Sequence, residues 1–331
     1  MYKLYERFVE SKNDMGGWIS DNMLIQPIKW QLSEALELAD SEDNAGGDSV
    51  AAQSIRIAHV VNFYETEDRE ARKVQQTTAR SMIAAKDHGR ASVRLFSVQT
   101  AEEKDVTPAG FERLPPLERD IRSFCDTKRP LPIISDIIDR ASQAVDDDSY
   151  LIFTDAGICV RPHFYDFIVK IVTRYGFDAI VVNRKNVHYR LIDALGEPEL
   201  DAEPGTIHPG HDCFVIKNEI YKKFIPTLTC IGAGAASTSL FYNIAAFARK
   251  AFLITNAHLT YHFGDEKGWR KGRENRMLAD HNRRQYEELF KRFMASEHRD
   301  RVLAYEKRWH APPKRFFFIN RPRICRTRPQ P

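Results

Sequence analysis

The chain has 331 residues, of which 43% are hydrophobic, and a formal net charge of +3. This length can supply one large or two modest hydrophobic cores, and the small net charge implies no general polyanion-binding role. No apolar run approaches the roughly 18 residues of a membrane span, and no secretory leader is recognisable, so we expect a soluble, cytoplasmic protein.

The cysteines are scattered and form no CxxC pair, which indicates reduced core residues rather than a disulfide framework.

The first 53 residues come before the part of the chain in which strand-like and helical segments alternate. Residues 1–38 place aromatic residues such as Trp18 and Trp30 within polar sequence, which predicts a helical docking segment. Residues 39–53 are acidic and contain glycine, the composition of a linker.

After the linker, apolar strand-like segments alternate with amphipathic helical segments. This alternation predicts an α/β fold with a mostly parallel sheet flanked by helices. We expect one domain over 54–270, with helical additions at both ends. The expected strands cover 55–63, 93–98, 151–155 and 179–183, and the expected helices cover 67–86, 133–145 and 162–175.

Beyond residue 183 the pattern is less regular. Residues 271–331 form a basic C-terminal helix and tail, and the tail interleaves arginines with aromatic residues over 315–328. We expect this tail to make a peripheral contact with the inner, anionic face of a membrane. The further expected strands cover 208–216, 251–255 and 258–266, and the further helices cover 237–250 and 276–296.

The most informative segment is the apolar run 151–154, which leads into Asp155. A buried parallel strand delivers such a carboxylate to the carboxyl edge of the sheet, where α/β proteins bind their ligands. The alternative is a structural aspartate that caps the next turn. Arg184 and Lys185 directly follow another expected strand and are placed to bind a diphosphate.

From about residue 55 to 269 the sequence resembles the GT-A-type, family-2-like glycosyltransferases, which use nucleoside-diphosphate sugars. Four segments occur in the expected order: 59–62 at the end of the first strand, 151–155, 208–216 and 259–265. The resemblance implies a GT-A-like sheet and a metal-assisted, inverting transfer to a polysaccharide or glycolipid acceptor. Nucleic acid is not an expected partner.

The resemblance also suggests roles for individual residues. Asn62 lies where such enzymes seat the nucleotide base, and Gly210 and His211 lie in the acceptor-side segment. Small residues around Gly232 allow close approach of a sugar, or simply tight helix packing. Asp212 is the first candidate for the general base, with Asp265 in reserve; the alternative for Asp212 is a structural turn hydrogen bond.

For the metal, Mn²⁺ or Mg²⁺, the candidate ligands are Asp155 and, by resemblance, His262; the alternative for His262 is a core histidine. One departure concerns this site. Related sequences carry Asn-x-Asp where this chain has Asp155-Ala156-Gly157, so glycine replaces the usual carboxylate. The alternative function is therefore a degenerate GT-A domain that binds a nucleotide, a glycan or a protein without turnover.

Overall fold

The computed structural model describes residues 55–196, 200, 202–254, 257–264 and 272–309. Within these ranges the chain forms one nine-stranded sheet, in the order β3-β2-β1-β4-β7-β6-β9-β5, with β8 paired to β6. The strands are β1 (Arg56–Val61), β2 (Ser92–Ser97), β3 (Glu112–Arg113), β4 (Tyr150–Thr154), β5 (Cys159–Val160), β6 (Ala179–Val187), β7 (Thr206–Lys217), β8 (Ala251–Ile254) and β9 (Thr260–Phe263).

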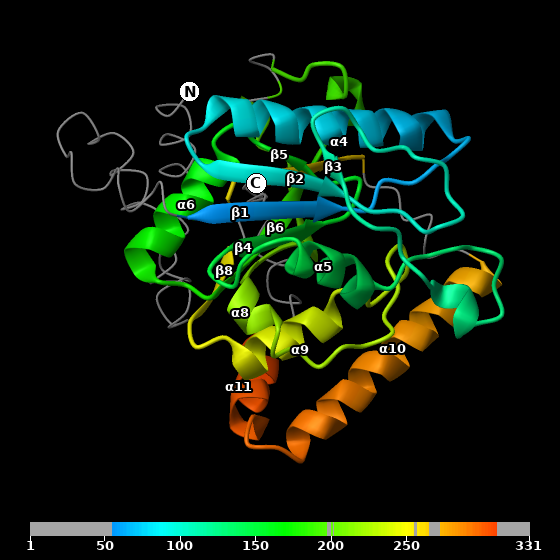
Figure 1. The fold of residues 1–331 in the computed structure, drawn as a ribbon, viewed down its shortest axis with the longest axis vertical. Coiled ribbons are helices and arrows are strands. Elements are labelled where there is room, and N and C mark those ends of the chain that lie inside the picture. Colours follow the sequence, from blue (N-terminus) through cyan, green and yellow to red (C-terminus); the bar gives the residue numbers. More distant parts are fainter. Residues whose placement is uncertain (1–54, 197–199, 201, 255–256, 265–271, 310–331) are drawn as a thin grey trace, which may run out of the picture.

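Helices cover both faces of the sheet, as the alternating sequence pattern predicts (Figure 1). They are α4 (Arg69–His88), α5 (Ile134–Gln143), α6 (Phe164–Tyr175), α8 (Asn218–Tyr221), α9 (Thr238–Phe247), α10 (Arg273–Met294) and α11 (Arg299–Trp309). None of the helices in the described ranges is long and apolar enough to cross a membrane.

The α/β class with a mostly parallel sheet is confirmed. Strands β1, β2, β3 and β4 run parallel to one another, and β6 is parallel to both β8 and β9. Two departures occur: β7 lies antiparallel between β4 and β6, and β5 pairs antiparallel with β9. Strands β6 and β7 are consecutive strands of the chain, and antiparallel strands need no crossover connection between them.

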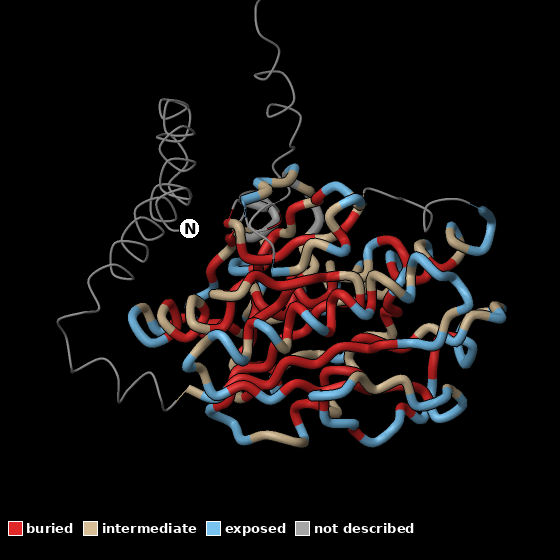
Figure 2. The backbone as a smooth tube through the Cα atoms, turned by 90° about the horizontal axis from the view of Figure 1, so that it is seen from above, coloured by how far each residue is buried: buried red, intermediate tan, exposed pale blue. Residues whose placement is uncertain are grey.

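Two apolar layers enclose the sheet because side chains of a strand alternate between its faces. In β1, Ile57 and Val61 join the cluster that holds Met82 of α4 and Phe164 of α6. Ala58 and Val60 of the same strand face the opposite cluster. Figure 2 shows the result, with buried strands at the centre and exposed residues on the outer helices and loops.

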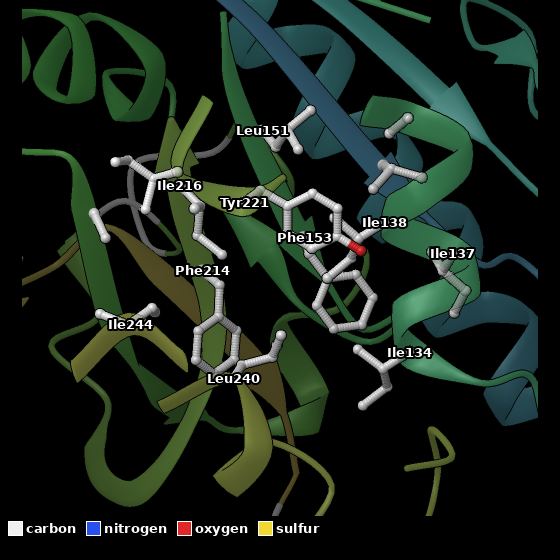
Figure 3. Close-up of a cluster of buried hydrophobic side chains, with 14 of the residues drawn as sticks. Ile134, Ile137, Ile138, Leu151, Phe153, Phe214, Ile216, Tyr221, Leu240 and Ile244 are labelled. Atoms are coloured by element: carbon white, nitrogen blue, oxygen red, sulfur yellow. The ribbon is translucent and has the colours of Figure 1, made fainter. Parts of the chain in front are cut away.

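The second cluster packs α5 and α9 against the middle of the sheet. Figure 3 shows Phe153 of β4 and Phe214 of β7 in one cluster with Ile137 of α5 and Leu240 of α9. Phe293 of α10 and Val302 of α11 belong to the same cluster. The charged C-terminal helix expected over 276–296 is therefore present as α10, and it contributes to the core.

Candidate functional site at the carboxyl edge of the sheet

The carboxyl ends of β1, β2 and β4 meet at one edge of the sheet, because these strands are parallel. From β1 the chain builds outward to β2 and β3, and it then returns to place β4 on the other side of β1. The order of the strands thus reverses between β1 and β4, and the crevice outside such a switch point is where open α/β sheets bind ligands. Asp155 directly follows β4 at this position.

Strand β7 brings Asp212 to the same place. Thr154 of β4 pairs with Cys213 of β7, so the next residue on each strand is an aspartate, Asp155 on one and Asp212 on the other. Two carboxylates that are distant in sequence therefore lie close enough for their charges to interact. The first strand-end acid and the predicted general base share one site.

The third member of the cluster is Arg184 of β6. The pairing of β6 with β7 is irregular on both sides of this residue, between Val182 and Lys185. Irregular register of this kind re-aims side chains. Nη1 of Arg184 lies 3.1 Å from Oδ2 of Asp212, and the two side chains are only 16% and 20% exposed.

This ion pair does not satisfy the hydrogen-bonding capacity of its members. Oδ2 of Asp212 and Nε of Arg184 have no partner with hydrogen-bond geometry among the described residues, although both atoms are buried. Nη2 of Arg184 lies 3.3 Å from Nε2 of His208. Buried polar atoms without partners are rare in folded proteins, and a bound polar ligand is one explanation for them.

The electrostatics of the two acids follow from this arrangement. Burial and, to a smaller extent, the nearby charge of Asp212 raise the pKa of Asp155, Arg184 lowers it, and the resulting pKa is about 7. Burial likewise raises the pKa of Asp212, against the lowering effect of Arg184. Carboxyl groups with raised pKa values at a strand edge are candidates for ligand binding and acid–base chemistry.

His262 lies beside the turn that contains Gly157. A β-carbon built on Gly157 would lie 3.1 Å from both Cδ2 and Nε2 of this imidazole. Nδ1 lies 3.4 Å from the carbonyl oxygen of Gly264, and the tautomer that donates this long hydrogen bond keeps its lone pair on Nε2. The histidine ring thus occupies the space next to Gly157.

Two other predicted site residues, Asn62 and Lys185, are almost completely buried. Asn62 is 3% exposed, and its Nδ2 donates a 2.7 Å hydrogen bond to the carbonyl oxygen of Val98, which links the ends of β1 and β2. Lys185 is 2% exposed, whereas the side chain of its neighbour Arg184 is 16% exposed. Asp265 lies outside the described residues, as do the N-terminal segment and the basic tail.

Of the acceptor-side residues, Gly210 and His211 both lie in β7. The His211 ring packs edge-on against Phe241 of α9, with the ring centres 4.6 Å apart. Gly232 has a φ of +72°, a backbone conformation that favours glycine. A β-carbon there would approach Leu131 and Arg129, at 3.6 and 3.9 Å.

Sequence reasoning missed Tyr64, which follows β1 at the same edge and is 41% exposed. Its backbone is held by the amide of Gln75, which accepts from the Tyr64 N–H at 3.0 Å and donates to the Tyr64 carbonyl at 3.1 Å. Burial raises the pKa of Tyr64, and so do the charges of Asp68 and Asp155, while Arg129 lowers it. The sequence signal was an aromatic residue directly after a buried strand.

No protein-family model matches the chain, and no curated protein does either. The solved structures that resemble it include S. aureus TarS 1–349 in complex with UDP-GlcNAc, with 11% sequence identity and a TM-score of 0.46. That similarity covers 77% of this chain and 72% of the TarS chain. A crystal structure described as a mycobacterial protein has 16% identity and a TM-score of 0.40, with 75% and 80% covered.

Proposed function

We propose that the chain is a GT-A-like glycosyltransferase that moves a sugar from a nucleoside-diphosphate sugar to a glycan or glycolipid acceptor in the cytoplasm. The observation that carries this proposal is the meeting of Asp155, Asp212 and Arg184 at the switch point of the sheet. Acidic residues there suit a polar, charged ligand, and the ordered sequence segments 59–62, 151–155, 208–216 and 259–265 agree with a sugar-nucleotide donor.

A divalent cation fits part of this residue set. The buried carboxylate of Asp155 offers the oxygen ligands that Mn²⁺ and Mg²⁺ prefer, and a cation would offset its repulsion from the charge of Asp212. We propose that Asp155 and His262 hold the ion. The described residues contain no group of three or more metal-binding side chains, so diphosphate oxygens and water would complete the coordination. A bound ion would neutralise the negative charge that develops on the leaving diphosphate.

Asp212 is our candidate for the general base. A raised pKa brings a carboxylate closer to the working range of a base at neutral pH. Its contact with Arg184 keeps the carboxylate oriented, and β7 carries Gly210 and His211 next to it. A base that activates the acceptor hydroxyl directly fits an inverting displacement. Asp265 remains the reserve candidate.

A second candidate function is a GT-A-like module that binds a nucleotide, glycan or protein without turnover. The observation that favours it is the packing of His262 against Gly157, where related sequences carry a carboxylate. With the histidine ring in this space, the acidic motif is reduced to Asp155. The two candidates predict different effects of removing the Asp155 carboxylate. If the chain is an enzyme, sugar transfer is lost; if it is a binding module, partner binding persists.

Calorimetric titration with UDP and GDP, with and without Mn²⁺, tests the donor site. We expect micromolar binding that requires Mn²⁺ and is lost in Asp155→Ala. The matched control is Asp148→Ala, which removes an exposed carboxylate before the opposite end of the same strand. Metal-independent binding would overturn the metal assignment. No binding of either nucleotide would favour the module without turnover.

A further inference from the structure

Arg129 lies at the same edge of the sheet as Asp155. It belongs to the loop that leads into α5, and in a parallel strand–helix–strand unit this loop follows the carboxyl end of the preceding strand. Two side-chain contacts tie the loop to the first turn of α10. Nη1 of Arg129 donates a 2.6 Å hydrogen bond to Oδ1 of Asn275, and Thr127 donates to Glu274. Figure 1 shows the start of α10 beside this loop.

Among the described residues, no carboxylate forms an ion pair with Arg129. Other arginines nearby form ion pairs, for example Arg119 with Asp136 at 2.8 Å and Arg122 with Asp120 at 2.6 Å. For Arg129 the described part of the chain contains no salt bridge, and the partner that holds it is a neutral amide. An arginine that is positioned but not neutralised is suited to bind an anion.

Two neighbours of the guanidinium relate it to the candidate site. Gly232 lies beside Nη2, and the β-carbon that this residue lacks would come within 3.9 Å of that atom. The phenol of Tyr64, which follows β1, interacts electrostatically with both Arg129 and Asp155. Arg129 thus brings a positive charge to the edge of the sheet that carries Asp155.

We propose that Arg129 binds the diphosphate of the nucleotide donor and that Asn275 positions its guanidinium. This inference rests on the proposed function, because it names the residue that recognises the charged part of the donor. The planar guanidinium donates two parallel hydrogen bonds to phosphate oxygens. It also offsets the repulsion between a diphosphate and the carboxylates of Asp155 and Asp212.

Calorimetry with UDP and GDP, compared with uridine and guanosine, tests Arg129. In Arg129→Ala we expect the affinity for the diphosphate to fall by roughly 10- to 100-fold, with nucleoside binding unchanged. Arg129→Lys keeps the positive charge but lacks the planar guanidinium with its two parallel N–H donors. It should give an intermediate loss of diphosphate affinity. The control is Lys128→Ala, which removes the same charge from the adjacent, exposed residue and should change affinity less than about twofold.

Asn275→Ala separates positioning from binding. It should weaken diphosphate binding in the wild-type background and have no further effect in Arg129→Ala, as a double-mutant cycle requires for residues that act together. Equal diphosphate affinity in wild type and Arg129→Ala would overturn the inference and leave the proposed function intact. An equal loss for nucleoside and diphosphate would also overturn it. If the wild-type protein binds neither nucleotide, both proposals fail.

Discussion

Asp155 couples the candidate site to the stability of the whole chain. In the folded protein its pKa is raised to about 7 by burial and by Asp212, against an ordinary value near 4 in the unfolded chain. The folded state therefore binds the proton more tightly. The stabilisation that protonated Asp155 gives to the folded state is fully present below about pH 4 and is lost as the pH rises through about 7.

The first prediction is that Asp155→Asn raises the melting temperature at pH 8 and raises it less at pH 5. The amide is similar in size but never carries the charge that opposes folding. Thermal unfolding at the two pH values measures the effect, at about 2–4 °C for each kcal/mol relieved. The control is Asp148→Asn, where the carboxylate is exposed. A gain that is the same at both pH values would contradict the electrostatic cause.

The second prediction concerns the contact between Gly157 and His262. In Gly157→Ala the new methyl group would lie 3.1 Å from two atoms of the His262 imidazole. Either the imidazole ring or the backbone at residue 157 must therefore move. We expect a loss of stability of about 1–3 kcal/mol, as for other overpacked sites. In a His262→Ala background the methyl group has space, and the same substitution should cost much less. Chemical denaturation of the four proteins tests this; equal costs in both backgrounds would refute it.

At the scale of single elements, helix α4 shows how local sequence signals fix a boundary. Asp68 precedes the helix and accepts hydrogen bonds from the N–H groups of Glu70 and Ala71, at 2.9 and 3.3 Å. The third prediction is that Asp68→Ala destabilises the protein by about 1 kcal/mol, because two N–H groups lose their partner. Asp87→Ala in the last turn of the same helix is the control, and urea unfolding measures both. A cost of the same size at Asp87 would argue against capping.

The elements that sequence could predict are those defined by local patterns. Strands β1, β2 and β4 and helices α4, α5 and α6 are short periodic segments, and each lies within about three residues of its expected bounds. The strand at 208–216 was expected as well, but its antiparallel place between β4 and β6 was not. Pairing partners depend on contacts between distant segments, which periodicity does not encode.

The candidate site shows the same limit. Asp155 was recognisable because an apolar run ends in an acid, and Arg184 because it follows another strand. Their meeting with Asp212 depends on the register of β4 and β7 and on the irregular pairing around residue 184. The closeness of His262 to Gly157 likewise arises only when β9 pairs with β5, which begins two residues after Gly157. Sequence therefore suggested the chemical groups, and the fold supplies their geometry.

At the scale of the whole molecule, the C-terminal helices belong to the central core. Phe293 of α10 is fully buried in the cluster that also contains Ile137 and Leu240. The fourth prediction is that Phe293→Ala destabilises the protein by about 3–5 kcal/mol. Lys291→Ala, on the exposed side of the same helix, is the control. If the melting temperature of Phe293→Ala equals that of the wild type, α10 contributes little to the core.

The position of the antiparallel strand β7 has a consequence for how the sheet assembles during synthesis. It fills the position between β4 and β6, and both of these strands leave the ribosome before it does. Residues up to about 175 can assemble β1, β2, β3 and β4 with their helices, but the free edge of β4 stays open to wrong partners until β7 arrives. The same event brings Asp212 to Asp155. The growing chain thus acquires its acidic pair only after β7 has joined the sheet.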